Sequence, residues 1–342
     1  MKDMISSKQE LTTQLVVSSS PHIRDAMTIE RLMWSTIIAL LPALFGSVYF
    51  FGLRALSLIT LSCASSLFFE ALAQKILGRK ITIYDGSALI TGILLAFSLP
   101  PGVPYFIPVV GSAFSIIIVK HLFGGLGYNF INPALAARAF LVVSWPTFMT
   151  KGFLPPQLGS LSGLSAITQA TPLTLIKDAR VFLRPEEAAK IITELNSPAS
   201  IRNLFFGQVG GCIGETSALL LLLGASFLLL IRVIDYRIPL AYLTTCFFIS
   251  LLTKLFIHHS PTPLFHLFSG GLILGAFFMA TDPVTIPITS KGRVVFGIGC
   301  GLITMLIRLF GGYPEGVCYS ILFMNIMTPF IERLTRPRIY GR

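Results

Sequence analysis

The sequence predicts an all-α polytopic membrane protein of about ten transmembrane helices, in two inverted five-helix repeats with one long extracytoplasmic loop. Of its 342 residues, 54% are hydrophobic and only 12% are charged, whereas soluble domains carry roughly 25% charged residues. About ten apolar runs approach the length of about 20 residues that crosses a bilayer. This composition excludes a soluble globular enzyme, a disordered chain and a secreted disulfide scaffold.

The apolar runs define the expected order of elements along the chain. The expected spans lie near residues 33–53, 55–74, 85–100, 104–123, 134–149, 213–231, 238–257, 264–281, 294–310 and 315–332. The resulting divisions are an N-terminal segment 1–30, a first membrane repeat 31–149, a loop 150–212, a second repeat 213–332 and a tail 333–342. Because Met1 to Thr28 is polar, we expect no cleavable signal peptide, and the first span serves as the insertion signal.

Lys and Arg residues predict the orientation of these spans. With the N-terminus in the cytoplasm, seventeen of the 26 basic residues fall on the inner side, three in short outer loops and six in the long loop. Cytoplasmic loops of membrane proteins carry the excess of Lys and Arg, and long loops largely escape this rule. We therefore expect both termini to be cytoplasmic and residues 150–212 to be extracytoplasmic.

Two sequence fragments occur in both halves and suggest a repeat. Residues 92–100 resemble residues 275–283, and each fragment is followed one helix later by Leu-Phe-Gly-Gly, at 122–125 and 309–312. Because each half contains an odd number of spans, the second half must be inverted in the membrane. Inverted repeats commonly hold a ligand at their interface, with broken helices lining it.

Helix breaks and charges inside apolar runs mark candidate sites in the membrane. Gly124, Gly125 and Asn132 are candidates for lining a cavity, because irregular backbone at membrane depth survives only in protein or beside a cavity. Asp85 and Asp282 are candidates for an ion pathway, since intramembrane charges are functional by default. The charges in or beside apolar runs mostly lie near span ends and are expected to reach the headgroups: Glu70, Asp85, Lys120, Glu215, Asp282 and Glu315.

Two other kinds of site are not expected. The net charge of +11 is spread over loops and forms no basic stripe, so no nucleic-acid partner is expected. The five cysteines form no CxxC pair and mostly lie in apolar runs, which is typical of small buried side chains and not of metal ligands.

The long loop carries the most specific motif. The string Ala-Thr-Pro-Leu-Thr that begins at Ala170 resembles the flavin-attachment box of the RnfD and NqrB family of membrane subunits. In the family pattern Asp-x-x-(Ser/Thr)-Gly-Ala-(Thr/Ser), Thr168, Ala170 and Thr171 match, whereas Ser165 and Gln169 replace Asp and Gly. The resemblance implies that an extracytoplasmic flavin transferase, with FAD as donor, esterifies the Thr171 hydroxyl with FMN phosphate.

The surroundings of this motif suit the attachment of a phosphate. Pro172 favours an extended backbone at Thr171, which is expected to present the hydroxyl outward to an enzyme. Lys177, Arg180 and Arg184 follow closely and are expected to offset phosphate charge.

The resemblance extends over the chain from near residue 16 to near residue 341. Further matching blocks lie at 18–24, 41–44, 48–52, 85–92, 120–127, 132–134, 138–140, 279–285 and 308–315. The short stretch before the first span and the string Ser-Ser-Ser-Pro-His favour the RnfD branch over NqrB, the longer subunit of the sodium-pumping quinone reductase.

This resemblance implies a subunit of an Rnf-type complex that moves electrons between ferredoxin and NAD and couples this to Na+ or H+ movement across the bacterial inner membrane. The chain contains no dinucleotide fingerprint after a strand, so ferredoxin and NAD chemistry is expected on partner subunits, membrane and peripheral, with no complete catalytic site here. Its implied part is an electron relay through covalent FMN on Thr171, with a second, noncovalent riboflavin. The alternatives are an NqrB-like subunit and a cofactor-free channel, transporter or structural subunit.

Overall fold

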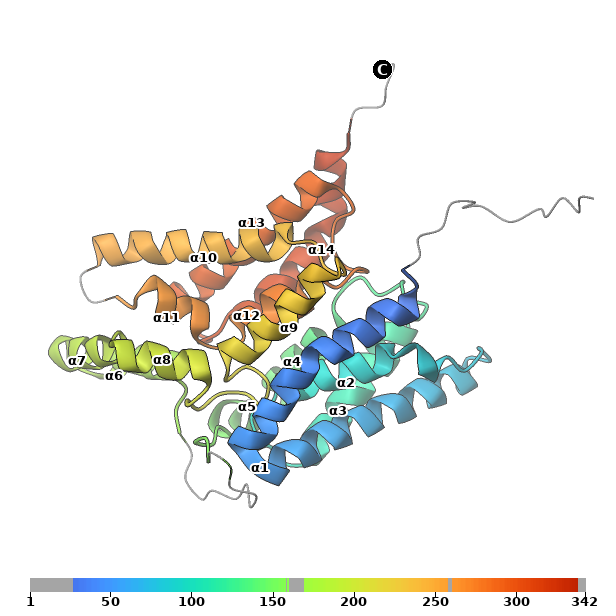
Figure 1. The fold of residues 1–342 in the computed structure, drawn as a ribbon, viewed down its shortest axis with the longest axis horizontal. Helices are drawn as coiled ribbons and strands as arrows, with labels where there is room; N and C mark the ends of the chain where they lie inside the picture. Colours follow the sequence, from blue (N-terminus) through green and yellow to red (C-terminus); the bar gives the residue numbers. More distant parts are fainter. Residues whose placement is uncertain (1–26, 158, 160–168, 258–259, 338–342) are drawn as a thin grey trace, which may run out of the picture.

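The computed structural model describes residues 27–157, 159, 169–257 and 260–337, and these form helices joined by turns and loops, without a β-strand (Figure 1). Three of the described helices are long and apolar enough to cross a membrane on their own: α1 (Ile29–Ile76), α10 (Arg237–Phe256) and α13 (Ser290–Phe310). The predicted all-α membrane architecture is confirmed.

The first half begins with a helical hairpin. Gly52 interrupts α1 with φ 66° and ψ −157°, a backbone conformation that is essentially restricted to glycine, and the chain turns back there (Figure 1). The first two predicted spans are therefore the two arms of α1. The remaining elements of this half are η1 (Ile83–Asp85), α2 (Ser87–Phe97), α3 (Phe106–Ala113), its π-helical continuation η2 (Phe114–His121), α4 (Pro133–Ser144) and α5 (Pro146–Lys151).

The long polar stretch contains three helices of its own, each with proline in its first turn. They are α6 (Pro172–Phe182), α7 (Pro185–Leu195) and α8 (Pro198–Phe206). Proline is favoured there because its missing N–H would have no partner in the helix.

The second half contains seven helical elements among its described residues, and one of its predicted spans is divided. Its elements are α9 (Ala218–Leu230), α10, α11 (Pro263–Phe268), α12 (Leu272–Leu274), η3 (Gly275–Met279), α13 and α14 (Val317–Thr335). The predicted span 264–281 is thus divided, because Ser269 and Gly270 leave the helical conformation between α11 and α12. The predicted span 134–149 is divided in the same way, because Pro146 disfavours the helical conformation at Trp145.

The two faces of the bundle are identified by hydrogen bonds. We call the end where α1 begins the N-terminal face and the end where α1 bends the loop face. The backbone N–H of Gln157 donates to the carbonyl of Phe50 beside the bend (2.7 Å), so the long polar stretch begins at the loop face. At the opposite face, Glu332 near the end of α14 accepts from the N–H of Ile288 (3.0 Å), and both described chain ends leave from that side (Figure 1).

The two Leu-Phe-Gly-Gly strings lie on opposite faces, as inverted repeats require. The carbonyl of Gly124 accepts from Arg79, which follows the returning arm of α1 at the N-terminal face (2.5 Å). The carbonyl of Gly311 accepts from Lys177 of α6 at the loop face.

Close packing and hydrogen bonds join the two halves. A Cβ atom at Gly224 of α9 would lie 1.9 Å from the carbonyl oxygen of Ala39 in α1, so only glycine permits this helix crossing. The N–H of Asn132 donates to Asn325 Oδ1 (3.3 Å), and Asn132 Nδ2 donates to the carbonyl of Met279 (3.3 Å). The N-terminus of α4 is thereby fixed to both η3 and α14.

Candidate functional site

Thr171 is the N-cap residue of α6. Its backbone is extended, as predicted, and its Oγ accepts from the N–H of Thr174 (3.2 Å) and lies 2.7 Å from Thr174 Oγ. The side chain is only 8% exposed, so the prediction of an outward hydroxyl is wrong: capping of α6 turns the oxygen inward. Of the motif residues, Gln169 and Ala170 are described, whereas Thr168 and Ser165 lie outside the described residues.

A cavity of about 170 Å³, which we call the loop cavity, opens beside Thr171. It is lined by α4, α5, α6 and the segment that leads into α14. Its polar or aromatic lining residues are Arg138, Thr150, Phe153, Thr171, Thr174, Lys177, Asp178, Tyr313, Glu315 and Tyr319. The rings of Tyr313 and Tyr319 lie 5.1 Å apart, and the buried Tyr319 hydroxyl has no partner among the described residues. The cavity therefore offers aromatic surface, an unused hydroxyl, the N-terminus of α6 and the cationic side chains of Arg138 and Lys177.

The three predicted phosphate partners occupy different positions. Lys177 lines the loop cavity, where partial burial lowers its pKa although Asp178 opposes this. Arg180 and Arg184 are exposed and are not among the lining residues; desolvation also lowers the pKa of Arg180. Only Lys177 is thus placed to offset a negative charge beside Thr171.

A cluster of charged and thiol groups lies below the loop cavity. Arg138 donates to the carboxylate of Glu315 and to Cys212 Sγ (3.7 Å). Glu215 accepts from the backbone N–H of Cys212 (3.1 Å). The guanidinium of Arg138 already supplies to Glu315 and Cys212 the positive charge that a metal ion would bring, whereas it makes no contact with Glu215 among the described hydrogen bonds and ion pairs.

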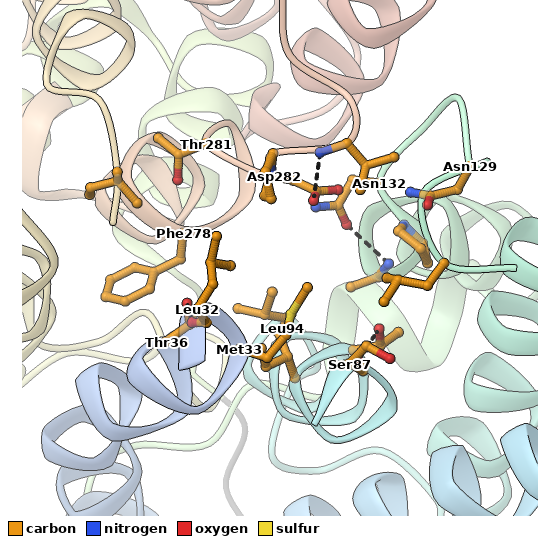
Figure 2. A pocket seen from close by; sticks show the side chains of 18 of the residues that line it. Leu32, Met33, Thr36, Ser87, Leu94, Asn129, Asn132, Phe278, Thr281 and Asp282 are labelled. Carbon is orange, nitrogen blue, oxygen red and sulfur yellow. Dashed lines mark hydrogen bonds between the residues drawn. The ribbon is translucent and has the colours of Figure 1, made fainter. Parts of the chain in front are cut away.

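A second cavity, of about 80 Å³, lies between the two halves near the N-terminal face, and we call it the interface cavity. Figure 2 shows its lining, in which the polar groups of Ser87, Asn129, Asn132, Thr281 and Asp282 surround it together with apolar side chains. Asn132 caps α4 here, since its Oδ1 accepts from two backbone N–H groups at 3.1 and 3.2 Å. A pocket with several hydroxyl, amide and carboxyl groups suits a small polar or polyhydroxylated ligand.

The other sequence candidates have separate positions. Gly124 and Gly125 adopt positive φ angles and are not among the residues that line the interface cavity, unlike Asn132. Asp282 lines it and accepts weakly from the N–H of Val284 (3.4 Å). Asp85 instead caps the start of α2, accepting from the N–H and Oγ of Ser87 at 2.8 and 2.7 Å.

Glu70, Lys120 and His121 form an inner charge cluster. Lys120 Nζ donates to both carboxylate oxygens of Glu70 (2.9 Å each) and to Ser87 Oγ (2.7 Å). His121 Nε2 lies 3.1 Å from a carboxylate oxygen of Glu70. Gln74 Nε2 donates to the other carboxylate oxygen of Glu70 (2.8 Å). Lys120 is 2% and Glu70 1% exposed. Lys120 also lines the interface cavity.

Two assignments made from the sequence are therefore wrong. Glu70 and Lys120 do not reach the headgroups, because they neutralise each other inside the bundle. Lys120 and Arg138, which are among the seventeen basic residues assigned to the inner side, are not loop cations that report orientation, since both are held in ion pairs. Charged residues inside apolar runs indicate that such pairs exist, because a buried charge needs a partner. The sequence alone does not show which residue that partner is.

These features define a polytopic helical membrane protein with two inverted halves and charged or polar sites between them. The chain belongs to the NQR2, RnfD, RnfE family, whose sequence model matches residues 16–341. It is 50% identical over 329 residues to the D subunit of the Na(+)-translocating ferredoxin:NAD(+) oxidoreductase complex of Acetobacterium woodii, covering 96% of this chain and 95% of that protein. It is 42% identical to the proton-translocating counterpart of Clostridium ljungdahlii over 330 residues, covering 95% and 96%. The D subunit of the ion-translocating oxidoreductase complex of Stutzerimonas stutzeri is 41% identical over 335 residues, covering 92% and 93%.

Proposed function

We propose that this chain is the D subunit of an Rnf-type complex, which couples electron transfer between ferredoxin and NAD to the translocation of Na+ or H+. The names and coverage of the relatives support this assignment. In the proposal the chain crosses the bacterial cell membrane several times, with its termini in the cytoplasm and the loop face outside. Other membrane and peripheral subunits of the complex carry the ferredoxin and NAD chemistry.

We further propose that Thr171 carries FMN through a phosphoester bond. The observation that carries this proposal is the position of its Oγ at the N-terminus of α6, beside a cavity that also holds Lys177. Helix N-termini favour phosphate because their N–H groups and dipole are positive. Tyr313 and Tyr319 supply aromatic surface for an isoalloxazine ring, and the unpartnered Tyr319 hydroxyl supplies a hydrogen bond. When bound, the flavin supplies one-electron and two-electron redox chemistry.

The chain also offers a route for the transferase that would attach the flavin. Gln169 is exposed and is held by its backbone N–H, which donates to the carbonyl of Phe153 (3.0 Å). Gln169 is thus accessible although Thr171 itself is buried. We propose that attachment by an extracytoplasmic flavin transferase tolerates Gln169 in place of glycine.

The interface cavity is our proposed site for a noncovalent riboflavin. Ser87, Asn129, Asn132 and Thr281 offer hydroxyl and amide groups that match the hydroxyls of a ribityl chain. Asp282 would fix one hydroxyl as an acceptor, and Phe278 contributes aromatic surface.

A set of Thr171 variants tests the covalent flavin. Thr171→Ala removes both the cap and the attachment oxygen, Thr171→Asn keeps the cap but offers no hydroxyl, and Thr171→Ser keeps both. We expect yellow fluorescence on a denaturing gel, and the mass of FMN on the tryptic peptide, in wild type, Thr171→Ser and the control variant below, but not in Thr171→Ala or Thr171→Asn. Thr262→Ala is the matched control, because Thr262 caps α11 before a proline in the same way (3.3 Å to Phe265 N–H).

The outcomes separate the alternatives. An unmodified peptide in the working complex, in a host that has the transferase, would refute the covalent flavin and favour a cofactor-free channel or structural subunit. Flavin that persists in Thr171→Asn would place the attachment at another residue.

A further inference from the structure

Two carboxyl groups, the buried Glu215 and the half-buried Glu315, meet beside the loop cavity. Cys212 Sγ and one carboxylate oxygen each of Glu215 and Glu315 all lie within 4.8 Å of one another. Glu215 and Glu315 line a small cavity of about 10 Å³ together with Thr171, and Glu315 also lines the loop cavity. The pair thus connects the protein interior with the proposed attachment site.

The two carboxyl groups have unequal partners. Glu315 is paired with Arg138. Glu215, which is 4% exposed, accepts at Oε1 from the backbone of Cys212, while its buried Oε2 has no partner among the described residues. This oxygen points toward Gly271, where an added Cβ atom would lie 2.7 Å from it.

The surrounding cations do not bind Glu215. The groups that face the pair are Arg138 on α4, Lys177 on α6, Cys212 before α9, Arg308 on α13, and Cys318 and Tyr319 on α14. Arg308 donates instead to the backbone carbonyls of His266, Ser269 and Glu315, at 2.6, 3.0 and 2.9 Å.

This arrangement favours a proton over a larger cation. A buried carboxylate without a contacting cation takes up a proton, and two carboxylates that share a site hold one proton between them. The small cavity is near the lower limit of about 10–15 Å³ for a single water molecule, so a hydrated Na+ has no room. A proton bound to a carboxylate oxygen needs no additional space.

We propose that Glu215 and Glu315 share one exchangeable proton and transfer it to and from a redox group in the loop cavity. As that group takes one electron from a reduced carrier of the complex, the O–H bond of the pair breaks and the proton passes to the group. The pair is left with one additional negative charge, which faces Arg138 and Arg308. When the electron leaves, the proton returns and the O–H bond forms again. The shared proton stands on the geometry alone, whereas its transfer rests on the proposed flavin at Thr171.

Infrared difference spectroscopy on the purified complex tests the shared proton. A pH change should show the C=O stretching band of a protonated carboxyl group that shifts in D2O. We expect this band to be lost in Glu215→Gln and in Glu315→Gln, displaced in Glu215→Asp, and unchanged in Glu187→Gln, which alters an exposed residue of α7. Glu215→Asp keeps a carboxyl group, so it tests the proposal even if the Gln variants do not fold.

The band should also persist in Thr171→Ala, so failure of the flavin proposal and failure of the shared proton are distinguishable. In the flavin-loaded complex, the one-electron reduction potential of the flavin should be lower in Glu215→Gln than in wild type, because the added electron is no longer accompanied by a proton from the pair. The proposal is overturned if the band is unaffected in both Gln variants. It is also overturned if replacing KCl by NaCl removes the band while Na+ binds, because the site would then be a sodium site.

Discussion

The inner charge cluster allows a quantitative test of how this membrane domain tolerates buried ions. Lys120 donates three hydrogen bonds, two to Glu70 and one to Ser87. We consider Glu70→Gln, Lys120→Met and the double variant. Each single change removes one partner of a buried ion pair, whereas the double change removes both.

The expected losses differ between the two single variants. Removing one partner of a buried ion pair lowers the free energy of unfolding by about 3–5 kcal/mol. Lys120→Met should fall at the lower end, about 3 kcal/mol, because Gln74 still donates to Glu70 (2.8 Å) and His121 Nε2 still lies 3.1 Å from it. Glu70→Gln should approach about 5 kcal/mol, since Lys120 then keeps only Ser87 and an amide oxygen. The double variant should lose less than the sum of the two, by about 1–3 kcal/mol.

The chain contains its own reporter for this measurement. Cys212, Cys246, Cys300 and Cys318 are buried, so a thiol-reactive fluorescent dye labels them only after unfolding. Unfolding by increasing amounts of a denaturing detergent in mixed micelles gives the free-energy differences. Lys190→Met on α7 is the control, because Lys190 is exposed and its removal should change the free energy by less than about 0.5 kcal/mol.

Two results would refute this reasoning. Equal stability of wild type and Glu70→Gln would show that water reaches Lys120. Additive losses in the double variant would show that the two residues do not interact in the folded protein.

Three further predictions follow from the same structure. Gly52→Ala should lower the free energy of unfolding by about 1–3 kcal/mol in the dye assay, because alanine is strained at φ 66° and ψ −157°; no loss would mean that α1 does not bend there. Asn132→Ala and Asn325→Ala should each destabilise by about 1–2 kcal/mol, because the first removes the cap of α4 and the second removes the acceptor of the Asn132 backbone N–H; unchanged stability of Asn325→Ala would contradict that bond. Burial alone would raise the pKa of Asp235, but hydrogen bonds from two arginines, among them Arg293, hold it below its usual value. Asp235 therefore stabilises the protein above the unfolded pKa of about 3.9 and ceases to do so as the pH falls through the lower folded value; Asp235→Asn should flatten this acid limb of a stability-versus-pH curve.

The all-helical membrane architecture was predictable because it depends on composition and on local rules. Long apolar runs must become helices in a bilayer, since the backbone has no other source of hydrogen bonds there. The kink at Gly52 and the division before Pro146 follow from the conformations that these residues allow or disfavour. The helices of the long polar stretch were not predicted, although α6 to α8 each carry a proline in the first turn, because a short polar helix has no periodic apolar face that stands out.

The sites were predictable only in part, because a site depends on contacts between distant residues. A local motif singles out Thr171 as a candidate, but the burial of Thr171 depends on α6, which its own side chain caps. The pairing of Lys120 with Glu70 spans 50 residues and that of Arg138 with Glu315 spans 177. No local pattern contains such a pairing.

Helix α4 reaches from one cavity to the other, so the distance between the two cavities is set by a single rigid helix. Asn132 at its N-cap lines the interface cavity, and Arg138 lines the loop cavity. Six residues of helix rise separate them by about 9 Å along the axis. α14 runs beside α4 and repeats this arrangement in reverse, since Tyr319 lines the loop cavity and Asn325 bonds to Asn132. A shift of either helix must therefore change both cavities at once, and the hydrogen bond between Asn132 and Asn325 resists such a shift. The electron relay proposed above needs this rigidity, because a relay depends on a constant distance between its carriers.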